Sequence, residues 1–377
     1  MGGPEIHIGD VGTQSVSIVA ASLNKASGLH LGPVKGANTL KVSGNTVEIV
    51  ASAKNVAKGV DAGKGADVTI GSSNAESVSI AGIKTGESQE GADEQAYGIF
   101  NVNQAQTKVY GKTVNVVAKG AKDTRAIHVA NNTEAQDKSA TLTIVGDEVC
   151  ITAESDDPDH STVGISAMSH GQVHITGNTV VTASDAIGAR GSSVVSINAD
   201  GRHYTQINGN VNFSYDAPTS GTSVDATVVL NLVGPESSWT GNMVVTWNGT
   251  PTNKDEYLSV TGMKLGLSKG AVWTPVETGH DSTTVTLGQK YTALNLLENN
   301  DGVINITDSA IDVTVEKMTG TGGTVNLAAD LTAEEGSQTG RITIDEADAN
   351  SKIDVKLKDA KMGRNLTFDD LPAEKAE

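Results

Sequence analysis

The sequence is poor in the residues that usually fill a compact core or crosslink it. Aromatic residues make up only 3% of the 377 positions, and Cys150 is the single cysteine. One cysteine excludes an intramolecular disulfide, and so few aromatic rings argue against a globular core built from large side chains. A repetitive fold does not need such rings, because it fills its interior with stacked small and branched aliphatic residues.

Long hydrophobic runs are also absent. No stretch of about eighteen apolar residues occurs, so the sequence predicts no membrane-spanning helix. No signal-peptide pattern is present, and residues 1–4 are interpreted as a cloning junction. If the natural protein is exported, we expect its targeting sequence to lie outside this segment.

Positive charge is scarce relative to negative charge. The chain has 45 acidic and 27 basic residues, which gives a formal net charge of -18. This balance argues against nucleic-acid binding and against docking on anionic lipid, because both need clusters of lysine and arginine. It is typical of a large solvated surface.

What the sequence does contain is a repeat. Four segments share one pattern, in which a short alternating strand is followed by a glycine and a polar residue and then by a second alternating strand. They are 39–49, 107–116, 141–151 and 172–182, with looser copies at 67–80 and 193–213 and a first strand expected from Glu5. Such alternation predicts strands with one buried face.

A second motif lies between these strand pairs and centres on one apolar residue. Its copies occur 22 to 39 positions apart at Leu29, Val60, Ile99, Ile127, Ile165 and Ile187. The longer spacings contain polar insertions at 85–95 and 154–161, which we interpret as loops. One repeat unit therefore holds three short strands and an insertion of variable length.

This pattern predicts a right-handed parallel β-helix, an all-β solenoid with three short strands per coil. Val47 and Ile49 should point inward and Glu48 outward, and Cys150 should also point outward. Asn101 is the exception, because it falls at an inward position. About 22 residues per coil and a strand spacing of about 4.8 Å predict a rod roughly 80 Å long.

An antiparallel sandwich or barrel is the alternative fold. Tight hairpins favour Asn-Gly or Asp-Gly turns, whereas the order here is reversed, as in Gly44-Asn45 and Gly146-Asp147. We therefore favour the β-helix and divide the chain into regular coils at 5–223, less regular coils at 224–310 and a C-terminal stem at 311–377. In the less regular part, strands are expected at 227–233, 238–247 and 258–267.

Three stretches of the C-terminal half resemble the passenger domains of autotransporters, above all the pertactin-like proteins. They are Ser238-Trp239-Thr240-Gly241, the strand entry Gly270-Ala271-Val272-Trp273, and the glycine-rich segment 318–327 followed by 341–344. The resemblance covers about 230–360 and depends on the order of the motifs. Residues 5–215 fit only the general pattern of a β-helix.

The resemblance implies a bacterial protein of type V secretion, exposed on the cell surface or secreted, with an outer-membrane β-barrel expected after residue 377. It also implies a role in adhesion, self-association or biofilm formation. The implied partner is another copy on a neighbouring cell, or a host glycan or matrix protein. The serine motif of protease-type passengers has no match here, and no Arg-Gly-Asp tripeptide is present.

No recognisable catalytic motif is present, so we expect neither an enzyme nor a cofactor. The sequence contains no Gly-x-Ser-x-Gly and no His-Glu-x-x-His. Gly111-Lys112-Thr113 matches the end of a phosphate-binding loop, but Gln106 stands where that loop needs glycine. A polysaccharide lyase or hydrolase on the same fold remains the enzyme alternative. It would need clustered carboxylates and aromatic platforms, and of the three tryptophans Trp239 and Trp247 fall in the less regular coils.

Two groups of residues invite a metal hypothesis. His170 and His174 lie four positions apart, but on an expected strand, where His174 should point outward in register with Lys108. The insertion at 154–161 carries an acidic cluster of Glu154, Asp156, Asp157 and Asp159. Calcium is conceivable there, although the spacing is not that of an EF-hand and a solvated loop is favoured.

The second motif predicts a ladder of side chains on the outside of the rod. The position after each central apolar residue should point outward, since it alternates with inward neighbours. Its occupants are His30, Asp61, Phe100, His128 and Ser166. Which exposed surface meets a partner is left open between the two insertions and a polar strand face.

Overall fold

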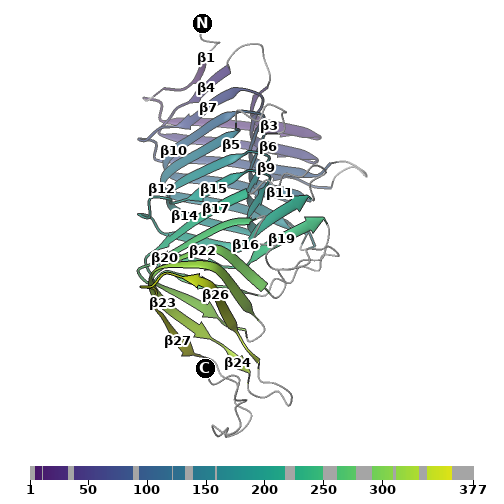
Figure 1. The fold of residues 1–377 in the computed structure, drawn as a ribbon. Helices are drawn as coiled ribbons and strands as arrows, with labels where there is room; N and C mark the ends of the chain where they lie inside the picture. The colour runs from purple at the N-terminus through teal and green to yellow at the C-terminus, as the bar shows by residue number, and fades with distance from the viewer. Residues whose placement is uncertain are drawn as a thin grey trace, which may run out of the picture.

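The protein is all-β, as predicted. The computed structural model describes residues 5–358 except 11, 33–37, 88–92, 121, 132–138, 158, 217–225, 249–260, 277–290, 309–310 and 331–337. Every regular element in this part of the chain is a strand. In the N-terminal and middle parts the strands are stacked across the long axis, whereas the last strands slope toward the C-terminus (Figure 1). The expected junction at residues 1–4 lies outside the described residues.

Most strands pair in parallel with a strand from the next repeat unit, and these pairs form three strand sets. The first set contains β1 (Glu5–Ile8), β4 (Asn38–Val42), β7 (Ala66–Gly71), β10 (Gln106–Lys119), β12 (Thr141–Glu154), β14 (Gln172–Arg190), β15 (Val194–Ile197), β17 (Ala226–Val233), β20 (Thr261–Ser268), β22 (Tyr291–Ile306), β23 (Asp312–Leu327) and β26 (Arg341–Ala347).

The second set begins with β2 (Ser15–Ser22), β5 (Thr46–Ala53) and β8 (Ser77–Lys84). It continues through later parts of β10, β12 and β14 to β16 (Thr205–Asp216), β18 (Ser238–Thr240), β21 (Val272–Thr274), parts of β22 and β23, and β27 (Ile353–Leu357).

The third set contains β3 (Lys25–Leu31), β6 (Val56–Ala62), β9 (Gln95–Val102), β11 (Asp123–Ala130), β13 (Thr162–Met168), the ends of β14 and β16, and β19 (Met243–Asn248). A small antiparallel pair, β24 (Ala329–Asp330) with β25 (Gln338–Thr339), lies apart from the three sets.

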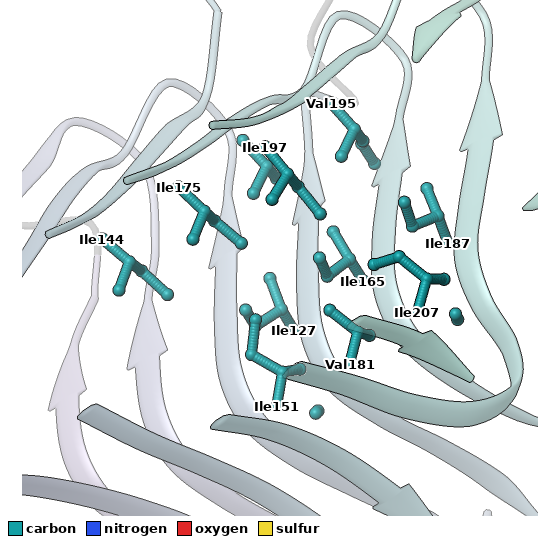
Figure 2. Packing of buried hydrophobic residues seen from close by; sticks show 14 of the residues in the cluster. Ile127, Ile144, Ile151, Ile165, Ile175, Val181, Ile187, Val195, Ile197 and Ile207 are labelled. Carbon is teal, nitrogen blue, oxygen red and sulfur yellow. The ribbon is translucent and has the colours of Figure 1, made fainter. Parts of the chain in front are cut away.

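Alternation along each strand fills the interior between the sets. Val47 and Ile49 are fully buried, while Glu48 between them is exposed, as predicted. In-register pairing repeats this choice from one strand to the next, so Ile49 stacks on Ile80 and Ile80 on Val116. Figure 2 shows isoleucines and valines from all three sets meeting in one core. Each such side chain contributes about 1.5–3 kcal/mol by leaving water.

The central residues of the second motif all belong to this core, as expected. Ile99, Ile127, Ile165 and Ile187 are fully buried, and Val60 nearly so. Cys150 is exposed, which confirms the predicted strand register around it. The expected strands in the less regular part correspond to β17, to β18 with β19, and to β20. The start of the last expected strand, 258–260, lies outside the described residues.

Two expectations about the repeat need correction. The predicted glycine turns at Gly111, Gly146 and Gly177 lie inside continuous strands, because glycine lets the backbone bend there without ending the strand. At Gly177, where φ is +133°, an added Cβ would lie only 1.9 Å from the carbonyl oxygen of Gly146.

The predicted length of roughly 80 Å is also too long. In-register partners such as His30 and Asp61 are 31 positions apart, so each unit takes more residues than expected. At about 4.8 Å per strand, the first set spans roughly 50 Å from β1 to β26.

Asn101 lies inside the core, and the structure explains how its polar side chain is satisfied. Its Nδ2 donates to the carbonyl oxygens of Ala105, at 3.2 Å, and of Thr141, at 3.0 Å. Its Oδ1 accepts a 2.8 Å hydrogen bond from the Thr107 hydroxyl. Asn101 is therefore fixed at the corner where β9 leads into β10 and is no defect in the core.

Candidate functional site

One corner of the stack, between the second and third strand sets, varies greatly in length. Leu23 and Asn24 suffice to join β2 to β3, and Lys54 with Asn55 joins β5 to β6. The next three connections are 85–94, 120–122 and 155–161. They follow β8, β10 and β12, which are successive neighbours in the second set. The two predicted insertions therefore fall on the same corner, with 120–122 between them, and their residues 88–92 and 158 lie outside the described residues.

These three connections surround a cavity of about 490 Å³, which we call the loop pocket. Its volume falls within the range of small-molecule sites. The lining consists of Lys84, Glu87, Glu94, Gly120, Lys122, Ser155, Asp156, Asp157 and His160. Sequence reasoning identified the first and third connections but missed 120–122, which is too short to stand out.

One wall of the loop pocket is basic around a single carboxylate. Glu94 lies between two ammonium groups, with its oxygens 3.6 Å from Lys84 Nζ and 3.8 Å from Lys122 Nζ. The side chains of Lys84 and Glu94 are only 12% and 18% exposed, whereas that of Lys122 is 62% exposed. Lys84 Nζ also donates a 2.9 Å hydrogen bond to the carbonyl oxygen of Gly86.

The part of the lining that comes from 155–161 is acidic, and we call it the acidic wall. The backbone N–H of Asp159 donates to Asp157 Oδ1 at 3.0 Å, and this bond is the main reason that the pKa of Asp157 is lowered. Asp157 Oδ2 lies 2.8 Å from His160 Nδ1. Asp156 faces Gly120, where an added Cβ would be 3.2 Å from Asp156 Oδ2. Gly120 also has a φ of +83°, so a side chain there would be strained as well as crowded.

Glu154 and Asp157 of the acidic cluster are engaged with other partners. Glu154 pairs with Lys119, at 3.4 Å, and both Asp157 oxygens are engaged as above. Within the described parts of the chain, no three His, Cys, Asp or Glu side chains are placed to hold a metal ion. His170 and His174 are not brought together into such a group. His170 occupies the β13–β14 corner, while His174 pairs in β14 with Thr143, in the predicted outward register.

Beside the loop pocket, the outer face of the third set carries two columns of side chains, which we call the aromatic–basic ladder. One column runs through Lys58, Tyr97 and Arg125, and the other through His30, Asp61, Phe100, His128 and Ser166. The register of the second column is the predicted one. Sequence reasoning missed the first column, whose members lie three positions before those of the second column in β6, β9 and β11.

Phe100 is enclosed on both ring faces by neighbours in the ladder. Lys58 Nζ lies 3.5 Å from the ring centroid, and the His128 ring stacks on Phe100 with centroids 5.1 Å apart. Lys58 and His128 come from the strands on either side of β9. The ring is therefore a structural element and not a free platform for stacking a sugar.

Arg125 connects the ladder to the loop pocket. Its Nε donates to Asp123 Oδ1 at 2.7 Å, and Asp123 also accepts a hydrogen bond from the Tyr97 hydroxyl. Burial raises the pKa of Tyr97, and the charge of Asp123 adds to this effect. Asp123 directly follows Lys122, and its backbone N–H bonds to the carbonyl of Glu94 at 3.0 Å. The ladder therefore anchors the basic wall.

His128 differs from the expectation of an exposed outer residue, since it is only 8% exposed. Burial, reinforced by the charge of Arg125, lowers its pKa to about 3. Ser166 Oγ lies 3.2 Å from His128 Nδ1, a spacing that suits a nucleophile and its base. A histidine with this pKa is a weak proton acceptor at neutral pH, and Arg125 Nη1 contacts the same nitrogen at 3.2 Å. This pair is therefore structural.

Trp239 and Trp273 do not supply exposed platforms either, since both are fully buried. The side chain of Trp247 lies outside the described residues. Among the described residues, the structure has no helix of the length and apolarity that crossing a membrane requires. Comparison with family models, with curated proteins and with solved structures gives no match to this chain.

Proposed function

We propose that this chain is a right-handed parallel β-helix and the passenger segment of an autotransporter, and that it presents the loop pocket to a partner at the bacterial surface. The parallel pairing of strands in three sets supports the solenoid part of this proposal. The three C-terminal motifs support the passenger part. Adhesion or self-association of cells is the resulting role, and catalysis is not part of it.

One observation carries the assignment of the surface. The corner between the second and third sets closes with Lys54 and Asn55 alone, yet three successive connections are longer and converge on one cavity. The fold does not need that extra length. Loops of this kind on a rigid scaffold are where binding functions concentrate.

The test is to display the chain on non-adherent bacteria and measure cell clumping and binding to host glycans and matrix proteins. In the key variant, 85–94 is replaced by the Lys-Asn connection found at 54–55. We expect this variant to lose most of the activity while its melting temperature stays within a few degrees. The matched control is Lys108→Gln, a charge change on the outer face of the first set, which should keep the activity.

Two results would contradict the proposal in different ways. Full activity of the shortened variant would exclude the loop pocket and turn attention to a strand face. Absence of clumping and of binding by the unaltered chain would count against a surface interaction role altogether. Depolymerisation of an added polysaccharide by the unaltered chain would favour the lyase or hydrolase alternative.

A further inference from the structure

We propose that the loop pocket binds a short zwitterionic ligand, with the charge pattern of a free amino acid or a small peptide. Its carboxylate would lie toward Lys84 and Lys122, and its ammonium group toward Asp156 and Glu87. This inference rests on the proposed function in one respect, because both assign binding to the loop pocket. It adds the chemical class of the ligand.

The basic wall has hydrogen-bond donors to offer to a carboxylate. An ammonium group has three N–H donors, and Lys84 gives one of them to the carbonyl oxygen of Gly86. Glu94 lies 3.6 Å from Lys84 Nζ and 3.8 Å from Lys122 Nζ, which is beyond good hydrogen-bond distance. Glu94 therefore neutralises part of the positive charge of this wall, while the N–H donors of Lys84 and Lys122 that face it stay available. A ligand carboxylate entering between the lysines could accept from both.

The acidic wall has carboxylates to offer to an ammonium group. Asp157 is held in place by Asp159 N–H and His160, which leaves Asp156 as the available acceptor on the 155–161 side, while Glu87 of the 85–94 connection also lines the pocket. Asp156 is aimed across Gly120, whose missing side chain keeps the space open. Lys84 and Lys122 come from the end of β8 and from 120–122, whereas Asp156 and Asp157 come from 155–161, so the two kinds of charge reach the pocket from different segments.

Ligands with other charge patterns fit less well. A simple anion would meet four carboxylates, and a simple organic cation would meet two lysines. Calcium needs six to eight oxygen ligands, and no group of three potential metal ligands is in place among the described residues. A neutral sugar would find no phenylalanine, tyrosine or tryptophan ring among the described lining residues. A zwitterion satisfies both walls at once.

The experiment is a calorimetric titration of the full chain at low salt with three matched probes. Glycylglycine carries both charges, N-acetylglycylglycine only the negative charge, and glycylglycinamide only the positive charge. We expect saturable binding of glycylglycine in the millimolar range, at least about tenfold tighter than either analogue. Screening of the charges should weaken it as salt is added.

Two variants assign the binding to the loop pocket. Lys122→Gln and Asp156→Asn each remove one charge, from the basic and the acidic wall respectively, and both lie in connections, so neither should disturb the strands. Each should weaken glycylglycine binding about fivefold, since part-exposed charge pairs contribute modestly. Lys108→Gln, on the outer face of the first set, should leave binding unchanged.

Several outcomes would overturn the inference. Equal binding of glycylglycine and glycylglycinamide would show a simple cation site, and equal binding of glucose would show a sugar site. No saturable binding of glycylglycine up to about 50 mM would exclude the ligand class. Adhesion of displaying cells that persists in any of these cases would leave the proposed function standing, so the two failures are distinguishable.

Discussion

Trp239 and Trp273 stack face to face in the core, with ring centroids 5.1 Å apart and an angle of 11° between the rings. They occupy paired positions of β18 and β21. Each indole N–H donates to a glycine carbonyl of the preceding repeat unit, Trp239 to Gly209 in β16 at 3.0 Å and Trp273 to Gly241, just after β18, at 3.2 Å. The Ser-Trp-Thr-Gly motif thus supplies a large core side chain, Trp239, and a glycine, Gly241, whose carbonyl accepts from the tryptophan of the next repeat unit.

Replacing Trp273 by alanine should therefore destabilise the C-terminal half strongly. The change removes a fully buried ring and leaves a cavity beside Trp239, which typically costs about 3–5 kcal/mol. Urea unfolding followed by near-ultraviolet circular dichroism measures this directly, and the signal of the stacked indoles should vanish as well. Val145→Ala, on an exposed side chain, is the control and should shift the free energy of unfolding by less than about 0.5 kcal/mol.

His128 should make the protein less stable in acid. Its pKa is about 3 in the folded chain against a reference of 6.5, so only the unfolded state takes up this proton between those values. Neutral His128 therefore costs no free energy of unfolding above pH 6.5, and the free energy of unfolding falls progressively as the pH falls from 6.5 toward 3. At pH 4.5 the loss should reach roughly 2–3 kcal/mol.

His128→Gln isolates this effect, because glutamine keeps an acceptor near Arg125 and does not titrate. The free energy of unfolding of this variant should fall less between pH 7 and pH 4.5 than that of the unaltered protein. His174→Gln, on an outward strand position, should leave the pH dependence unchanged. Parallel pH curves for all three proteins would show that His128 is not protected from protonation.

His170 should be replaceable by glycine with a gain in stability. Its φ is +66°, in the left-handed region that non-glycine residues adopt at a cost of about 1 kcal/mol. His170→Gly relieves this strain, so we expect the free energy of unfolding to rise by about 0.5–1 kcal/mol. The paired variant His174→Gly, in β14, should lower it by a similar amount, because glycine weakens a strand. A loss of stability in both variants would contradict the turn geometry.

Asn101 should be intolerant of an apolar replacement despite lying in the core. Asn101→Leu leaves the Thr107 hydroxyl and two carbonyl oxygens without their partner, and we expect a loss of about 3 kcal/mol in thermal or urea unfolding. Thr107→Val alone should cost about 1 kcal/mol. The double variant should lose less than the sum, since the two residues share a bond. Strict additivity would argue against that bond.

The strands could be predicted because their information is local. Val47, Glu48 and Ile49 alternate within three residues, and burial follows that alternation in the structure. Asn101 could be placed inward by the same rule, but its partners could not, because Thr141 is brought to it from forty positions away.

The candidate site could be predicted only in part, because it depends on which connections share a corner. The insertions at 85–95 and 154–161 were visible as polar gaps in the repeat. Their convergence on Gly120 and Lys122 follows from the pairing of β8 with β10 and of β10 with β12, which no local pattern reveals. The burial of His128 was also missed, since it depends on Phe100, which stacks on it from the neighbouring strand β9, and on the position of Arg125 beside it in β11.

The central claim is that successive repeat units stack in parallel and in register, which brings the three connections together. Distances between pairs of spin labels test it most directly, in a Cys150→Ser background with labels at outward positions of one column. One column of register partners runs from Lys41 through Thr69 to Lys108, and through Thr143 to His174. It continues through Ser196 and Val229 to Lys264. At about 4.8 Å per strand, we predict backbone separations of roughly 10, 19 and 34 Å from Lys41 to Lys108, His174 and Lys264. A Lys41–Lys264 distance no longer than the Lys41–Lys108 distance would contradict the parallel stack and, with it, the loop pocket.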